Sequence, residues 1–144
     1  MTMNDIQLMR LAITEAKKSK EPTKCGVVIA KDGAVIAKTY NSQREDCNAS
    51  SHAEIKALGV AGKTVGNKDL IGCDVYCTCE PCAMCTIALV FAKVKKIYTG
   101  SSMTKTTKNN FDIGFEKIIK DAPIRIETKT SFMEAECDGL LDIK

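Results

Sequence analysis

Histidine and arginine are both scarce in this sequence. The chain has a single histidine, His52, so it cannot form a zinc site of three histidines or a metalloprotease motif with two. Of the 21 basic residues only three are arginine, Arg10, Arg44 and Arg125. Bidentate arginine is the side chain that most often reads base edges in the grooves of duplex DNA. The composition therefore disfavours a sequence-specific binder of duplex DNA.

The sequence also lacks long apolar runs. No stretch approaches the roughly 20 apolar residues that a membrane-spanning helix needs. The first ten residues, MTMNDIQLMR, do not place an apolar run after a basic region, so we expect no secretory signal, no membrane association and a cytoplasmic location. In that reducing setting the eight cysteines are expected to be thiols or metal ligands rather than a disulfide framework.

What is present indicates one globular domain covering residues 1–144. A chain of this length can bury roughly 70% of its unfolded surface, so a full core is possible. Hydrophobic residues make up 44% and charged residues 27%, close to the globular average. The net charge of +3 is mildly basic and leaves RNA binding open without requiring it.

Hydrophobic periodicity predicts helices and strands in alternation after an opening hairpin that turns at Lys31-Asp32-Gly33. The predicted helices cover about residues 4–18, with Thr2 or Asn4 as cap, 52–60, 81–91, 113–120 and 132–141. The predicted strands cover 25–30, 34–40, 74–79, 95–100 and 124–128. This order predicts an α/β fold: a three-layer α/β/α arrangement around a mixed five-stranded sheet.

Two short segments carry the side chains best suited to bind a metal. Cys82 and Cys85 have the C-x-x-C spacing that lets two thiolates share one metal ion, and His52 can supply a third ligand. Three protein ligands with a fourth position open to water are typical of catalytic zinc. Both segments fall at predicted helix N-termini, where the helix dipole lowers a thiolate pKa. Glu54, two residues after His52, is placed to carry protons.

Other interpretations of these residues remain open. Cys79 could join His52, Cys82 and Cys85 in a closed structural zinc site, as in a non-enzymatic module that binds RNA through its lysines. Glu54 could instead complete a capping box with Ser51. The six remaining cysteines have the character of small buried apolar side chains. They are Cys25, Cys47, Cys73, Cys77, Cys79 and Cys137.

The segments HAEIKAL and EPCAMC together resemble the H-x-E…P-C-x-x-C signature of the cytidine-deaminase-like superfamily of zinc-dependent deaminases. They look most like the branch that holds guanine deaminases, tRNA wobble-adenosine deaminases and cytosine deaminases. The resemblance implies zinc held by His52, Cys82 and Cys85, with Glu54 as the catalytic proton shuttle. It also implies a substrate contact from Asn41 and a homodimer.

The substrate expected from this resemblance is a free base, guanine first. Phe111 and Asp112 are similar to the Phe-Asp segment of guanine deaminases, where a ring can stack on the base and a carboxylate can accept its N–H groups. The C-terminal segments 124–128 and 133–141 are closer to the tRNA-editing branch. Residues 24–27, Lys-Cys-Gly-Val, depart from the usual Pro-x-Gly-Ala and alter the pocket wall. The alternatives are adenosine in tRNA, cytosine or another amino heterocycle.

Overall fold

A computed structural model of the chain describes residues 2–102 and 113–141. Its helices are α1 (Asp5–Ala16), α2 (Ala53–Val65), α3 (Ala83–Phe91), α5 (Phe115–Asp121) and α6 (Glu134–Asp138). Its strands are β1 (Gly26–Lys31), β2 (Ala34–Tyr40), β3 (Cys73–Cys79), β4 (Lys96–Ser101) and β5 (Glu127–Lys129). The order of elements along the chain is the one predicted from periodicity.

The five strands form one mixed sheet in the order β2-β1-β3-β4-β5. β1 is antiparallel to both β2 and β3, whereas β4 runs parallel to β3 and β5 parallel to β4. Parallel neighbours need crossover connections, and helices α3 and α5 lie in those connections. The predicted mixed five-stranded sheet is confirmed.

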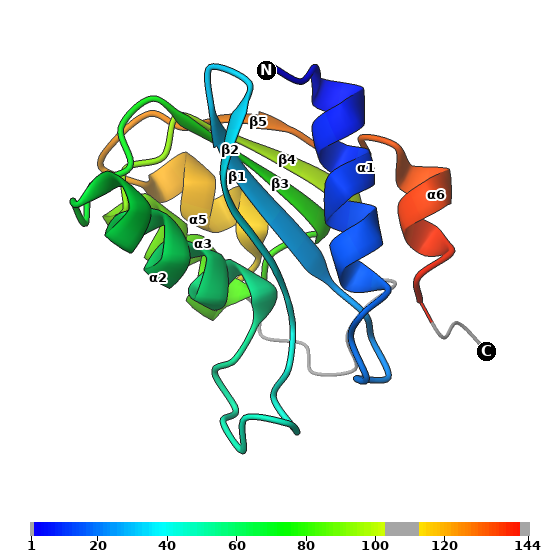
Figure 1. The fold of residues 1–144 in the computed structure, drawn as a ribbon. Helices are drawn as coiled ribbons and strands as arrows, with labels where there is room; N and C mark the ends of the chain where they lie inside the picture. The colour runs from blue at the N-terminus through cyan, green and yellow to red at the C-terminus, as the bar shows by residue number, and fades with distance from the viewer. Residues whose placement is uncertain (1, 103–112, 142–144) are drawn as a thin grey trace.

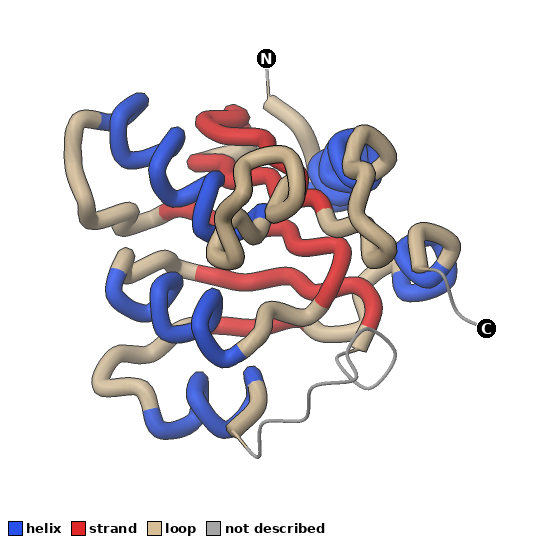
Figure 2. The backbone as a smooth tube through the Cα atoms, turned by 90° about the horizontal axis from the view of Figure 1, so that it is seen from below, coloured by secondary structure: helices blue, strands red, loops and turns tan. Residues whose placement is uncertain are grey.

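Helices cover both faces of the sheet, with α1 and α6 on one side and α2, α3 and α5 on the other (Figure 1). Successive residues of a strand point to opposite faces, so the sheet divides the core in two. Val27 and Ile29 of β1 pack in the cluster below α2 and α3, while Val28 and Ala30 pack against α1. The view turned by 90° shows the strands as a layer with helices on both sides (Figure 2). This is the predicted three-layer α/β/α fold.

The helix ends explain two boundaries. Asn4 caps α1 in a capping box with Gln7, so Asn4 rather than Thr2 is the cap. Helix α2 continues past the predicted end near Val60 to Val65. It stops where Gly66 adopts a left-handed conformation (φ 72°), which is a common way for a helix to end.

Other predicted boundaries are also wrong. Helix α3 begins at Ala83 with Cys82 as its N-cap, so Pro81 precedes the helix instead of opening it. Strand β5 starts only at Glu127, where pairing with Lys96 of β4 begins. Helix α6 starts at Glu134 because Met133 is left-handed (φ 54°) and cannot belong to the helix.

Gly26 marks the closest approach of α1 to the sheet. A Cβ at this position would overlap the carbonyl oxygen of Ala12 and lie 2.6 Å from the backbone nitrogen of Ala16. We expect Gly26→Ala to lower the free energy of unfolding by about 1–3 kcal/mol or more, because backbone must move to admit the methyl group. Urea unfolding of the purified variant measures this loss.

Gly59→Ala is the matched control for that substitution. Gly59 lies inside α2, and a Cβ there has no heavy atom within 4 Å. Alanine in a helix interior should stabilise the protein by about 0.5–1 kcal/mol relative to glycine. Equal stability of the two variants would contradict the close packing of α1 on β1.

Across residues 2–102 and 113–141, no helix has the length and apolar character that crossing a bilayer would require.

Candidate active site

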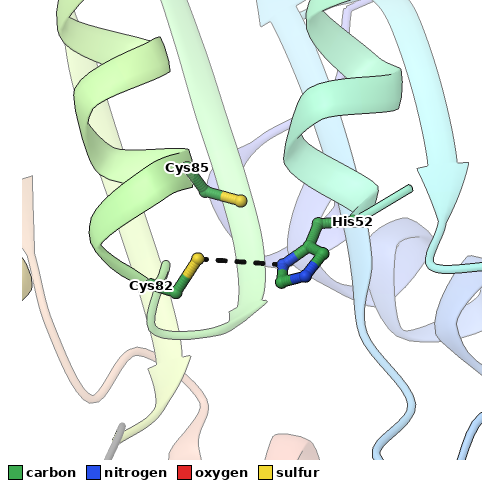
Figure 3. Close-up of side chains that lie close together, drawn as sticks. All are labelled: His52, Cys82 and Cys85. Carbon is green, nitrogen blue, oxygen red and sulfur yellow. Dashed lines mark hydrogen bonds between the residues drawn. The ribbon is translucent and has the colours of Figure 1, made fainter. Parts of the chain in front are cut away.

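The three predicted metal ligands come together at the N-terminal ends of two neighbouring helices. His52 is the N-cap residue of α2, Cys82 is the N-cap residue of α3, and Cys85 lies in the first turn of α3. Their ligand atoms all lie within 4.8 Å of one another. The three side chains point toward a common space between the helices (Figure 3). The fold thus converts two segments 30 residues apart in sequence into one cluster.

The electrostatics of the cluster favour a bound cation. The pKa of Cys82 falls to about 4, first because Cys85 donates a hydrogen bond to it and also because His52 does. Its sulfur lies 3.7 Å from Nδ1 of His52. The hydrogen bond between His52 and Cys82 raises the pKa of His52. The pKa of Cys85 is raised by its hydrogen bond to Cys82 and by burial. One thiolate is therefore formed without metal, and a cation would favour the second.

The donor set fits zinc. Zinc is commonly held by two cysteine sulfurs and one histidine nitrogen in sites that keep a position for water. Among the residues that the structure describes, the cluster of potential ligands consists of His52, Cys82 and Cys85, and it does not include Cys79. The sulfur of Cys79 instead lies 2.6 Å from that of Cys25. A closed site of three cysteines and one histidine is therefore not the arrangement found.

Glu54 is a buried carboxyl group beside the metal ligands. Glu54 lies in the first turn of α2, and only 4% of its surface is exposed. Burial raises the pKa of Glu54, and a hydrogen bond from Cys85 acts in the opposite direction. A carboxyl group with a raised pKa at the wall of a pocket is suited to proton transfer near neutral pH.

The alternative role of Glu54 as a capping-box partner of Ser51 is not found. The N-cap of α2 is His52, and no side chain caps that helix end. The Ser51 hydroxyl instead donates to Asp46, whose pKa is lowered first by the hydrogen bond from Ser42 and then by the one from Ser51. Glu54 thus stays available to the pocket.

A pocket of about 730 Å³ opens over the cluster, within the range of roughly 300–1,000 Å³ usual for small-molecule sites. Its wall includes His52, Glu54 and Cys82, together with Asn41. The Asn41 side chain holds the neighbouring segment in place, since its Oδ1 accepts from the Cys25 amide at 2.9 Å and its Nδ2 donates to the Thr23 carbonyl at 2.8 Å. Its contact with substrate stays a prediction, supported by its place in the wall.

Two of the predicted substrate contacts, Phe111 and Asp112, lie outside the described residues. Sequence reasoning missed other members of the wall, which include Glu21, Cys25, Gln43 and Ile113. The Oε1 atom of Gln43 is buried and has no hydrogen-bond partner among residues 2–102 and 113–141. The departure from Pro-x-Gly-Ala at residues 24–27 is a sequence signal that points to this wall, since Cys25 belongs to both.

Comparison with known proteins places the chain in a family. The family model described as the cytidine and deoxycytidylate deaminase zinc-binding region matches residues 2–101. A tRNA-specific adenosine deaminase of Agrobacterium fabrum is 37% identical over 99 residues, which are 67% of this chain and 65% of that protein. A guanine deaminase of Bacillus subtilis is 37% identical over 90 residues, which are 62% of this chain and 58% of that protein. The chain thus spans less than two thirds of the length of either relative.

The fold is also that of solved deaminases. A structure from a study of A-to-I editing by tRNA:A34 deaminases at the wobble position of transfer RNA superposes with a TM-score of 0.83 and 30% identity. The match covers 94% of this chain and 99% of that one. The matched region carries the histidine, the glutamate and the cysteine pair in the cluster described above. The chain therefore belongs to the cytidine and deoxycytidylate deaminase zinc-binding family, within the cytidine-deaminase-like superfamily.

Proposed function

We propose that this chain is a zinc-dependent hydrolase that deaminates adenosine in tRNA. The observation that carries the proposal is the position of Glu54, a buried carboxyl group that is hydrogen-bonded to Cys85 and lies in the pocket wall together with His52 and Cys82. Hydrolytic removal of an amino group from a base ring requires a metal ion that activates water and a proton carrier beside it.

The chemistry divides between the metal and Glu54. Zinc held by His52, Cys82 and Cys85 would lower the pKa of a bound water to about 7. The Glu54 carboxylate takes the proton of the attacking water and delivers it to the ring nitrogen next to the carbon that bears the amino group. Glu54 then takes the second proton of that water from the hydroxyl group on the ring carbon and gives it to the amino nitrogen. The C–N bond breaks, ammonia leaves and the ring carbon becomes a carbonyl. One water is consumed for each ammonia released.

The choice of tRNA over guanine corrects the order expected from Phe111 and Asp112. The relatives reported above include both kinds of enzyme, but the wobble-editing deaminase structure matches 94% of the chain at 30% identity, whereas the sequence match to the guanine deaminase covers 62%. Exposed basic side chains also precede the pocket-wall residue Glu21 along the chain. Lys17, Lys18 and Lys20 are exposed and stand just before Glu21, the first residue of the pocket wall along the chain. The Nε atom of Arg44 lies 3.6 Å from the carboxylate of Glu21.

Salt dependence separates the two substrates. If the three lysines each neutralise one phosphate of a tRNA anticodon stem-loop, a fourfold rise in salt should lower its apparent affinity roughly 20-fold, because log K falls by about 0.7 per phosphate for each tenfold rise in salt concentration. Ammonia release from the stem-loop and from guanine is measured across the same salt series. Lys20→Ala should reduce the slope, whereas Lys63→Ala, at the far end of α2, should leave it unchanged.

Guanine is the second candidate, favoured by the likeness to the Bacillus subtilis guanine deaminase. Turnover of guanine that is insensitive to salt, with no reaction on the stem-loop, would overturn the tRNA proposal and promote guanine. A zinc-loaded protein inert toward both would move the substrate to cytosine or another amino heterocycle. A non-enzymatic zinc module would bind the stem-loop and release no ammonia from any of these bases.

The partner proposal is a homodimer formed through α2 and α3. These helices leave large apolar side chains in solvent, above all Phe91, which is 76% exposed, together with Val60 and Ile87. Covering apolar surface of this kind favours association. We expect Phe91→Asp to give a monomer by light scattering, while Lys63→Ala stays dimeric. A wild-type monomer at micromolar concentration would contradict the proposal.

A further inference from the structure

Cys25 and Cys79 face each other at one end of the sheet. In the antiparallel ladder of β1 and β3 the last paired residues are Val27 and Cys77, and continuing that register by two residues sets Cys25, just before β1, opposite Cys79. Directly opposite residues of an antiparallel pair have Cα atoms about 4.5–5.5 Å apart. Disulfides join Cα atoms separated by about 4.4–6.8 Å. The backbone therefore already has the spacing that a disulfide requires.

The side chains of Cys25 and Cys79 point toward each other across this spacing. The sulfur atoms lie 2.6 Å apart, with the Cys25 thiol donating to Cys79. The Cys25 backbone is fixed from both sides, because its N–H donates to Asn41 Oδ1 and its carbonyl accepts from the Asn41 N–H. Cys79 is held as the last residue of β3. The thiols are thus placed against each other by two strands and by Asn41.

A small oxidant can reach this pair through the pocket. Both Cys25 and Cys79 line its wall, and Cys25 is only half-buried. Cys73 and Cys77 are buried in the core below α2 and α3. Cys47 is exposed, with its thiol directed to the Arg44 carbonyl instead of a second sulfur. Cys25 and Cys79 thus line the pocket, through which an oxidant can enter, and each has the other's sulfur beside it.

We propose that Cys25 and Cys79 are a reversible modification site, at which a hydroperoxide joins the two thiols into a disulfide across the wall of the pocket. One thiolate attacks a peroxide oxygen, the O–O bond breaks, and a sulfenic acid and one water form. The second sulfur then attacks the sulfenic sulfur, the S–S bond forms, and the S–O bond breaks to release the second water. The two thiols lose two electrons, and hydrogen peroxide is reduced to two waters.

The modification is distinct from the metal centre and does not depend on the proposed substrate. Cys82 and Cys85 are the ligand pair, and a bound metal protects thiolates from disulfide formation by occupying them. The disulfide would tie the residue before β1 to the last residue of β3 beside Asn41, and neither of its sulfur atoms belongs to the ligand cluster. Zinc content should therefore be the same before and after oxidation.

The test uses the full-length, zinc-loaded protein and hydrogen peroxide as the probe. After treatment, free thiols are alkylated and the digest is examined by mass spectrometry without reduction. We expect a cross-linked peptide pair that contains Cys25 and Cys79, loss of two alkylatable thiols, unchanged zinc, and full recovery of both thiols with dithiothreitol. Single replacements Cys25→Val and Cys79→Val should each abolish the cross-link, whereas Cys47→Ser should retain it.

Two results would overturn the proposal. One is separate alkylation of Cys25 and Cys79 at peroxide doses that already oxidise the exposed Cys47. The other is a cross-link between Cys82 and Cys85 with loss of zinc while the Cys25 and Cys79 thiols stay free. If both valine variants fail to fold, the wild-type cross-link map and the Cys47→Ser control still decide between these results.

Discussion

Glu54→Gln is expected to abolish most turnover while leaving zinc and fold in place. General acid–base groups contribute typically about 10²–10⁴-fold, and Glu54 serves several proton transfers in one cycle, so the upper part of that range is expected. Glutamine has nearly the same shape and cannot carry a proton. Because burial already raises the pKa of Glu54, its replacement by a neutral amide should cost little stability. Ammonia release, zinc content and thermal unfolding are measured on the same preparation.

Glu136→Gln is the matched control, since this glutamate is exposed on α6 and contributes nothing to the pocket wall. It should retain full turnover. The assignment of Glu54 as proton carrier would be wrong if the Glu54→Gln protein kept normal turnover per folded molecule. It would also be wrong if the whole loss of activity followed from unfolding.

Cys82→Ala is expected to remove the metal and with it all measurable activity. This residue supplies the sulfur with the lowest pKa, and only His52 and Cys85 would be left to hold the ion. A ligand present at 1,000 times its Kd stabilises the folded state by about 4 kcal/mol. Loss of zinc should therefore lower the Tm by roughly 10 °C. Elemental analysis of protein purified without added metal should give one zinc per wild-type chain and almost none in the variant.

Cys47→Ser is the matched control for that experiment, because Cys47 is an exposed cysteine outside the ligand cluster. It should keep its zinc, its Tm and its turnover. Wild-type protein that is free of metal and fully active would refute the metal centre altogether. Extraction of zinc with a chelator should reproduce the effects of Cys82→Ala in the wild type and change nothing further in the variant.

The cluster of possible metal ligands and the carboxyl group beside it could be predicted from the sequence because each depends on residues at short spacing. The C-x-x-C spacing places Cys82 and Cys85 on one turn, and Glu54 follows His52 by two residues at a helix start. The alternation of helices and strands likewise predicted the layers, since one buried face per element leaves few ways to pack them. Boundaries failed at Pro81, Met133 and Glu127, where capping or pairing with β4 decides the end of an element.

By itself the sequence determined the fold class, the family signature and the donor set for zinc, because each depends on residue types at short spacing. Only the tertiary structure decided what lies around that centre. It placed the sulfur of Cys79 beside that of Cys25 and outside the ligand cluster. The reason is the antiparallel register of β1 and β3, which, continued by two residues beyond Val27 and Cys77, sets the two cysteines opposite each other. It also buried Glu54 and brought Gln43 and Glu21 into the pocket wall. These contacts join residues far apart in the chain, and they depend on the packing of helices and strands that no local pattern encodes.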